Sequence, residues 1–335
     1  MQPIRLAIVG CGAIVENNHL PALRTCPEWQ LACLVDANQE RVQGLARDYG
    51  CQGLTDITKI PAEIEVVLVA VPNHLHGSLV QHFLQNDCHV LCEKPMTITS
   101  QEGGKLLALS GVRRRLLVVG HQLRFLPSVQ LLRKMLRSGD LGNIQHIDLA
   151  MGWASQWQSV TNFYEDHALA GGGVMLDLGC HLLDLAFYLF GDLTRTRFLG
   201  AEFDVNSTSL ERAITVELFF ASGFKGLLRV SRLTNLNNAI SVYGDSGRAI
   251  ASFDGAIFDI MLPSSALCAM GRAARLELAT QDPFVSMWKN FHRAIREGSK
   301  AAPDLCYADL GVQTTNIIEQ LYHQMRSSCT VTFPS

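Results

Sequence analysis

The chain has 335 residues, a formal net charge of −3, 48% hydrophobic residues and 18% charged residues. This length suits two domains, and this composition is typical of folded globular proteins rather than disordered ones. The longest basic cluster is Arg113–Arg115, and no apolar run reaches the roughly 18 residues that span a bilayer, so neither nucleic acid nor a membrane is an expected partner.

Short apolar runs rich in β-forming residues alternate with helical segments over the first 120 residues. The expected strands are Arg5–Val9, Gln30–Val35, Val66–Val71, His89–Cys92 and Leu116–Val119. The expected helices are Ile14–Thr25, Gln39–Tyr49, His76–Gln85 and Ser100–Leu109. The strands are continuously apolar, as in a parallel sheet that is covered on both faces. This alternation predicts an α/β fold over residues 1–121, a doubly wound Rossmann sheet with right-handed crossovers.

From residue 122 onward the pattern changes, and a few helices are combined with a series of consecutive strands. The expected helices are Pro127–Ser138, Val174–Leu189, Pro283–Glu297 and Tyr307–Arg326. The expected strands are Ile144–Trp153, Thr196–Phe203, Ala213–Phe220, Gly226–Ser231, Ala239–Gly244, Arg248–Phe253 and Ile257–Leu262. Turn residues between consecutive strands are typical of antiparallel hairpins. Residues 122–335 are therefore predicted to form an α+β domain with an open, mostly antiparallel sheet.

A glycine-rich turn, Gly10-Cys11-Gly12-Ala13-Ile14-Val15, joins the first strand to the first helix. In a dinucleotide-binding fold the first glycine allows the tight turn, and the second lets the backbone approach a pyrophosphate at the helix N-terminus. The third position is normally glycine or alanine and is valine here. The pattern predicts a cofactor-binding loop that includes Gly10, Gly12, Ala13 and Ile14.

Asp36 ends the second expected strand, 24 residues after Gly12. A carboxylate at this place binds the ribose hydroxyls of NAD and repels the 2′-phosphate of NADP. Ala37 and Asn38 follow it, with no arginine to hold that phosphate. NAD is therefore favoured over NADP. The alternative is that Asp36 caps the next helix, since aspartate is a good N-cap residue.

Two further motifs carry ionisable residues. Glu93-Lys94-Pro95 follows the fourth strand, where open α/β sheets bind their ligands; the alternative is an exposed lysine before a loop proline. After Gly171-Gly172-Gly173, the residues Asp177, His181 and Asp184 are spaced to share one helical face within an apolar stretch. Such a stripe is either a functional site or a satisfied core histidine with a capping aspartate.

The combination of GCGAI, Val71-Pro72-Asn73-His74-Leu75-His76, EKP, and GGG followed by DxGxH resembles the Gfo/Idh/MocA oxidoreductases. The resemblance covers nearly the whole chain, including Arg124-Phe125-x-Pro127. It implies that His181 transfers the proton, that Lys94 contacts the reacting hydroxyl and the nicotinamide, and that Asp177 binds substrate or orients His181. Arg124 would lie near the substrate. The remaining positions implied to contact the cofactor are Pro72, Asn73, His76, Glu93 and Gln122.

The implied activity is hydride transfer between NAD and a secondary hydroxyl of a sugar, nucleotide sugar or cyclitol. The resemblance also implies a homodimer or homotetramer formed through the C-terminal sheet. Aromatic residues before the GGG motif could stack on a sugar ring, or they could be ordinary packing: Trp153, Trp157, Phe163 and Tyr164.

Three other functions remain open at this stage. Some relatives use bound NAD during glycoside hydrolysis, which would release product without net NADH. A non-catalytic relative could sense the dinucleotide, although such proteins tend to lose the lysine and the histidine. A metalloenzyme could use His74 and His76 with the Asp177, His181 and Asp184 face, but dedicated ligand spacing is missing, so no metal is expected.

Ten cysteines are scattered without a CxxC pair, and the first residues lack the pattern of a secretory signal. The cysteines are therefore expected to be reduced thiols that pack as small apolar residues. A cytoplasmic location is the corresponding expectation.

Overall fold

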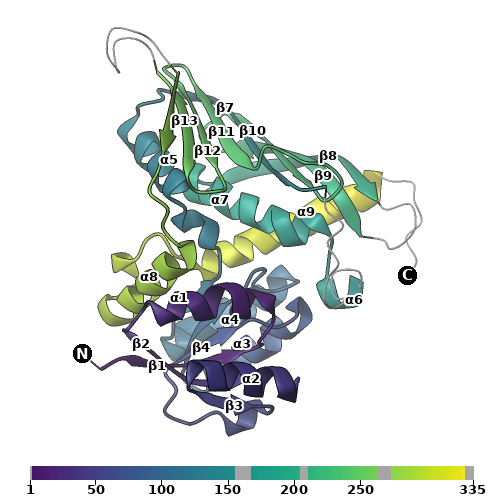
Figure 1. Ribbon diagram of the computed structural model, residues 1–335. Helices are drawn as coiled ribbons and strands as arrows, with labels where there is room; N and C mark the ends of the chain where they lie inside the picture. Colours follow the sequence, from purple (N-terminus) through teal and green to yellow (C-terminus); the bar gives the residue numbers. More distant parts are fainter. Residues whose placement is uncertain (1, 155–166, 204–209, 263–272, 329–335) are drawn as a thin grey trace. The chain divides into compact units, whose positions relative to one another are not determined.

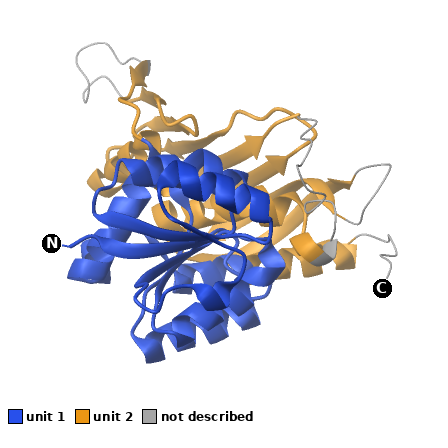
Figure 2. Ribbon diagram, turned by 60° about the horizontal axis from the view of Figure 1, so that its bottom comes forward, with its two compact units in different colours: residues 1–122, 282–315 blue, residues 123–281, 316–335 orange. Residues whose placement is uncertain are grey.

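The computed structural model describes residues 2–154, 167–203, 210–262 and 273–328. The chain divides into two compact units. Figure 1 colours the chain along its sequence, and Figure 2 gives each unit its own colour. Unit 1 contains Met1–Gln122 and Asp282–Thr315, and unit 2 contains Leu123–Gln281 and Asn316–Ser335. The segment from residue 282 to 315 thus belongs to unit 1, whereas the sequence pattern places it in the second domain.

Unit 1 is built on a sheet with the strand order β15-β6-β5-β4-β1-β2-β3. Its strands are β1 (Ile4–Val9), β2 (Trp29–Val35), β3 (Gln52–Leu54), β4 (Val66–Val69), β5 (His89–Cys92), β6 (Leu117–Val119) and β15 (Cys306–Tyr307). All neighbours pair in parallel except β15, which is antiparallel to β6. The predicted Rossmann sheet is confirmed.

Helices cover both faces of this sheet (Figure 2). They are α1 (Leu20–Arg24), α2 (Gln39–Tyr49), α3 (His76–Gln85), α4 (Ser100–Arg113), α8 (Pro283–Glu297) and the first residues of α9 (Ala308–Ser328). Val67 and Val90 point toward α3 and α4 in one apolar cluster. Their neighbours Leu68 and Leu91 point the other way and are also fully buried. Burial on both faces explains why the strands are continuously apolar.

The segment from residue 282 to 315 joins unit 1 through tertiary contacts that the sequence pattern does not reveal. β15 adds to the sheet edge, with Cys306 opposite Val119. In α8, Trp288 is fully buried and its ring centre lies 5.1 Å from that of Trp29. A strand of two residues is too short to show a period, so the sequence predicts a helix that begins at Tyr307 instead.

Unit 2 is built on a sheet with the order β14-β13-β12-β11-β7-β10-β9-β8. Its strands are β7 (Ile144–Gly152), β8 (Leu193–Phe203), β9 (Glu211–Phe220), β10 (Lys225–Ser231), β11 (Ala239–Gly244), β12 (Arg248–Ser252), β13 (Ile257–Met261) and β14 (Ala273–Glu277). Every neighbouring pair is antiparallel except β7 with β10. The mostly antiparallel sheet is confirmed, and the sequence missed β14.

One face of this sheet packs on helices within unit 2 (Figure 1). The helices on this face are α5 (Pro127–Ser138), α7 (Cys180–Phe190) and the second part of α9; the short helix α6 (His167–Ala170) also belongs to unit 2. Alternate residues such as Val216 and Leu218 join the core formed with α5, α7 and α9. The residues between them, Glu217 and Phe219, point the other way and are only partly buried.

Two predicted helices begin with a π-helical turn rather than an α-helical one. These turns span Val15–His19, before α1, and Met175–Gly179, before α7. The apolar spacing of the sequence cannot distinguish a single π turn from an α turn, so each helix was predicted as continuous. Such turns are frequent at functional sites, and both of these lie beside predicted site residues.

Every cysteine in the described residues carries a free thiol, and all of them except Cys51 are buried. Burial, together with the nearby Asp36 charge, raises the pKa of Cys11 to about 12. Such a thiol is an inert packing residue. None of the described helices is long and apolar enough to cross a bilayer.

Candidate active site

The two glycines of the first turn are required for different reasons. Gly10 has a φ of +95°, and a Cβ there would lie 2.1 Å from the carbonyl oxygen of Ala70. A Cβ on Gly12 would meet no heavy atom within 4 Å. The fold itself therefore needs the first glycine, whereas the space at the second is open to a ligand. Val15, at the third position, is fully buried.

Alanine substitutions separate these two roles. Gly10→Ala should lower the free energy of unfolding by about 2 kcal/mol or more, because it adds strain and a backbone clash. Gly12→Ala should leave that free energy within about 0.5 kcal/mol of wild type and weaken NAD binding about tenfold or more, since the methyl group fills the ligand space. Urea unfolding and calorimetric NAD titration measure the two effects. Equal stability losses in both variants would contradict this division.

Asp36 anchors the glycine turn to the end of β2. Its Oδ2 accepts a hydrogen bond from the Cys11 N–H at 2.7 Å, and its Oδ1 accepts one from the Asn38 N–H at 2.8 Å. Helix α2 is capped by Asn38, whose Oδ1 accepts from the Arg41 N–H. Asp36 is therefore not the N-cap of that helix, and the alternative reading is wrong. Its carboxylate stands half-buried beside the turn, where it suits a ribose.

His76 connects the carboxyl ends of β4 and β5. Its Nε2 lies 2.8 Å from the carbonyl oxygen of Val71, and its Nδ1 lies 2.7 Å from that of Pro95. Burial lowers the pKa of His76, although the two carbonyls oppose this. The side chain is 1% exposed, so its place is within the wall of the site. Pro72 and Asn73 precede it at the surface, with Asn73 in a short 3₁₀ turn (Asn73–Leu75).

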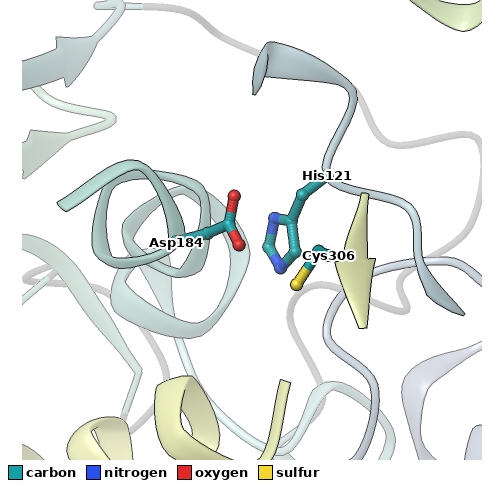
Figure 3. Close-up of side chains that lie close together, drawn as sticks. All are labelled: His121, Asp184 and Cys306. Atoms are coloured by element: carbon teal, nitrogen blue, oxygen red, sulfur yellow. The ribbon is translucent and has the colours of Figure 1, made fainter. Parts of the chain in front are cut away.

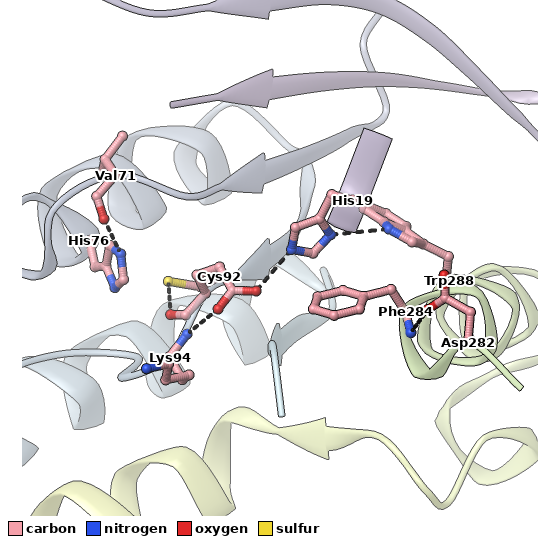
Figure 4. Close-up of polar contacts among 9 residues, drawn as sticks. His19, Val71, His76, Cys92, Lys94, Asp282, Phe284 and Trp288 are labelled. Atoms are coloured by element: carbon pink, nitrogen blue, oxygen red, sulfur yellow. Dashed lines mark hydrogen bonds and ion pairs between the residues drawn. The ribbon is translucent and has the colours of Figure 1, made fainter. Parts of the chain in front are cut away.

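Lys94 is the second residue after β5, is half-buried, and forms a cis peptide bond with Pro95. The Glu93 Oε2 accepts a hydrogen bond from the Lys94 backbone N–H at 3.2 Å. The Glu93 Oε1 lies 2.9 Å from Nε2 of His19, a residue that the sequence analysis did not select (Figure 4). Burial alone would raise the pKa of Glu93, but His19 and the Lys94 charge outweigh it and lower the pKa.

In unit 2, the π turn and α7 carry the second motif. His181 is 6% exposed on α7. Asp177 lies in the π turn, and its Oδ2 accepts a hydrogen bond from Nη2 of Arg232, which follows β10. Arg232 is not among the residues that the sequence analysis selected. Its partner across 55 residues could be found only from the fold.

A buried carboxylate holds the start of this π turn. The two Glu211 oxygens accept hydrogen bonds from the backbone N–H groups of Gly173 and Met175, at 3.2 and 2.9 Å. The Tyr322 hydroxyl donates to Glu211 Oε1 at 2.9 Å. A Cβ on Gly172 would lie 2.4 Å from the Tyr322 hydroxyl, which explains a glycine there. Glu211 and Tyr322 therefore position the motif, and sequence reasoning missed both.

Arg124 and Asp184 form a buried ion pair within unit 2. The Arg124 Nε and Nη2 donate to the two Asp184 oxygens at 2.7 and 2.6 Å, and both side chains are 1% exposed. The guanidinium also lies over the Tyr188 ring, 4.6 Å from its centre. Gln122, the first residue of the same 3₁₀ turn (Gln122–Phe125), is half-buried.

Figure 3 shows His121 and Cys306, which lie side by side in unit 1. A ring nitrogen of His121 and the Cys306 Sγ are within 4.8 Å of each other. Asp184 in the same picture belongs to unit 2 and accepts from Arg124. The predicted alternative of a metal site on His74 and His76 is weakened, because both nitrogens of His76 already face backbone carbonyls.

Of the aromatic residues proposed to stack on a sugar, Trp153 is 47% exposed at the end of β7. Trp157, Phe163 and Tyr164 lie outside the described residues. The open space at Gly12, the Asp36 carboxylate and Lys94 beyond β5 suit a dinucleotide on unit 1. The candidate site residues of unit 2 lie on the π turn and on α7.

Comparison with known proteins agrees with this arrangement. The chain is 28% identical to the D-glucoside 3-dehydrogenase of Escherichia coli (strain K12) over 192 residues, 56% of this chain and 54% of that protein. It is 24% identical to the inositol 2-dehydrogenase of Rhizobium meliloti (strain 1021) over 255 residues, 74% of this chain and 75% of that protein. For the first three curated relatives, the match spans only 54%, 56% and 59% of their length.

Among solved structures, a levoglucosan dehydrogenase in complex with NADH and levoglucosan superposes with a TM-score of 0.85 at 19% identity, covering 98% of both chains. This likeness shows the fold. A family model described as "Oxidoreductase family, NAD-binding Rossmann fold" matches residues 4–121, and one described as "GFO/IDH/MocA C-terminal domain" matches residues 129–250. The chain belongs to the Gfo/Idh/MocA family of oxidoreductases, and residues 4–121 form its NAD-binding Rossmann domain.

Proposed function

We propose that this protein is an NAD-dependent dehydrogenase that transfers a hydride between the nicotinamide and a secondary hydroxyl of a sugar, nucleotide sugar or cyclitol. The observation that carries the proposal is the place of Lys94. It lies two residues beyond β5, with its backbone N–H bound by the buried Glu93, in a unit whose first turn leaves open space at Gly12. The relatives described above, a glucoside dehydrogenase and an inositol dehydrogenase, support this substrate class.

In unit 1, the residues proposed to bind the dinucleotide are the first turn and Asp36, with Pro72 and Asn73 nearby. When bound, NAD supplies the acceptor for the hydride. Lys94 then places an ammonium group where negative charge develops on the substrate oxygen, and this charge-assisted hydrogen bond stabilises the alkoxide. His76 and Glu93 hold the strand ends that carry these groups.

In unit 2, His181 is proposed to take the hydroxyl proton, because an imidazole titrates near neutral pH. Asp177 is proposed to bind substrate or to orient His181. The ion pair with Arg232 supports the positioning role, since it fixes the carboxylate in the π turn. Arg124 is proposed to act through Asp184, which lies one turn further along the same helix as His181.

The direct test follows the NADH absorbance band while the purified protein is given NAD and a panel of sugars, cyclitols and nucleotide sugars. At least one class should produce NADH, and the rate with NADP should be lower because Asp36 repels the 2′-phosphate. Turnover with none of these classes would contradict the proposal. Release of a hydrolysed glycoside without net NADH would favour the hydrolase alternative instead.

We further propose a homodimer or homotetramer formed through the exposed face of the unit 2 sheet. That face combines apolar side chains such as Phe219 with ion pairs such as Arg229 with Asp148, at 2.6 Å. Mixed apolar and paired polar groups suit a protein interface. Sedimentation velocity at several concentrations tests this. The cytoplasmic location stays a prediction.

A further inference from the structure

A chain of buried hydrogen bonds in unit 1 runs from α8 to Lys94 (Figure 4). The Trp288 Nε1–H donates to Nδ1 of His19, with 3.2 Å between the nitrogens. The other ring nitrogen of His19 lies 2.9 Å from Glu93 Oε1, and Glu93 Oε2 accepts from the Lys94 N–H. Trp288 and His19 are fully buried. Trp288 is thereby linked to the Lys94 backbone through the side chains of His19 and Glu93.

The direction of these bonds fixes the proton on His19. An indole N–H can only donate, so Nδ1 of His19 must accept and carries no proton. The single proton is then on Nε2 and is donated to the Glu93 carboxylate. A second proton on Nδ1 would face the Trp288 N–H. His19 is therefore held as the neutral tautomer that can donate to Glu93.

The surroundings leave the Glu93 carboxylate little freedom. It is 6% exposed, and a Cβ on Gly120 would lie 2.7 Å from its Oε1. The side of His19 facing α8 meets the Phe284 ring, whose centre lies 4.9 Å away, and the Trp288 ring. The charged group in contact with His19 is Glu93, the residue after β5, and Lys94 follows it in the chain.

We propose that Trp288 and His19 are positioning residues for Lys94, acting through Glu93. With the His19 proton on Nε2, one Glu93 oxygen accepts a fixed hydrogen bond and the other accepts the Lys94 backbone N–H. A His19 proton on Nδ1 instead would leave Oε1 of Glu93 without that donor, and the carboxylate would no longer be held against Lys94. This inference rests on the proposed function for its catalytic consequence, whereas the hydrogen-bond chain does not depend on it.

Trp288→Phe tests the proposal because it keeps a ring and removes the N–H donor. Nδ1 of His19 then loses its donor, so the ring proton is no longer confined to Nε2 and Glu93 loses its fixed partner. The kcat should fall about tenfold, with the NAD dissociation constant nearly unchanged. A merely structural defect would weaken NAD binding as well.

Trp29→Phe is the matched control. Trp29 packs on Trp288 and is 7% exposed, and its Nε1 has no hydrogen-bond partner among the described residues. The substitution removes the same atoms without touching His19, so its kcat should stay close to that of the wild type. Gly120→Ala is a second, independent variant: its methyl group should displace the Glu93 carboxylate and lower kcat even where Trp288→Phe folds poorly.

A measurement without substrate follows the histidine side chains by nitrogen-15 NMR, with the His19 signal assigned from its loss in His19→Gln. Wild-type His19 should carry its proton on Nε2 alone, whereas Trp288→Phe should show the proton on Nδ1 as well. A proton on Nδ1 in the wild type, or an unchanged tautomer in Trp288→Phe, would overturn the hydrogen-bond chain. A changed tautomer together with an unchanged kcat would overturn the positioning role. Absence of any wild-type turnover would contradict the proposed function alone.

Discussion

Lys94→Met should lower kcat by about 10²–10⁴-fold, because the variant loses the ammonium group that stabilises the alkoxide in the transition state. The methionine side chain keeps much of the length and packing of lysine. The Lys94 backbone N–H, bound by Glu93, is also unchanged by the substitution, so the end of β5 should keep its shape. Steady-state kinetics on the substrate identified by NADH absorbance measures the effect.

The NAD dissociation constant should change less than threefold in the same variant, since most of the dinucleotide contacts lie at the glycine turn and Asp36. Lys94→Arg should recover only part of the activity, because a planar guanidinium cannot replace a compact ammonium group at a fitted site. Lys105→Met is the control, since Lys105 is exposed on α4 of the same unit. Turnover of Lys94→Met within a few-fold of wild type would exclude Lys94 from the chemistry.

Much of the fold was predictable because the burial of each sheet leaves its own pattern of apolar residues in the sequence. The strands of unit 1 are buried on both faces and read as unbroken apolar runs, whereas β9 alternates, with Val216 buried and Glu217 partly exposed. This reasoning places the segment from residue 282 to 315 in the second domain, whereas in the structure the segment groups with unit 1. Its place depends on the pairing of Cys306 with Val119 and on the packing of Trp288 against Trp29.

The candidate site residues that the sequence analysis selected lie at strand ends or in motifs, as with Asp36 and Lys94. Their roles remain predictions. The missed residues act as partners across long stretches of chain: His19 meets Glu93 across 74 residues, and Trp288 meets His19 across 269. For His19, the available signal was a histidine directly before the apolar residues Leu20, Ala22 and Leu23 of the first expected helix. Such a histidine needs hydrogen-bond partners, but sequence alone does not identify them.

The second large effect concerns the ion pair between Arg124 and Asp184, which connects the first turn of unit 2 to α7. Asp184→Asn should lower the free energy of unfolding by about 3–5 kcal/mol, because it leaves a guanidinium buried without its counter-charge. The amide group would also place an N–H donor opposite one of the Arg124 nitrogens. Urea unfolding followed by circular dichroism measures the loss.

The matched control is Asp259→Asn, because Asp259 on β13 and Arg275 on β14 form the same kind of bidentate ion pair. The two hydrogen bonds of that pair measure 2.8 and 2.9 Å. That pair is exposed, so water and salt screen it and the substitution should change stability far less. Replacing both Arg124 and Asp184 by leucine should restore much of the stability lost in Asp184→Asn, since the buried charge is then absent. If the double variant were less stable than Asp184→Asn, Arg124 would have to contribute through contacts other than this pair, such as its place over the Tyr188 ring.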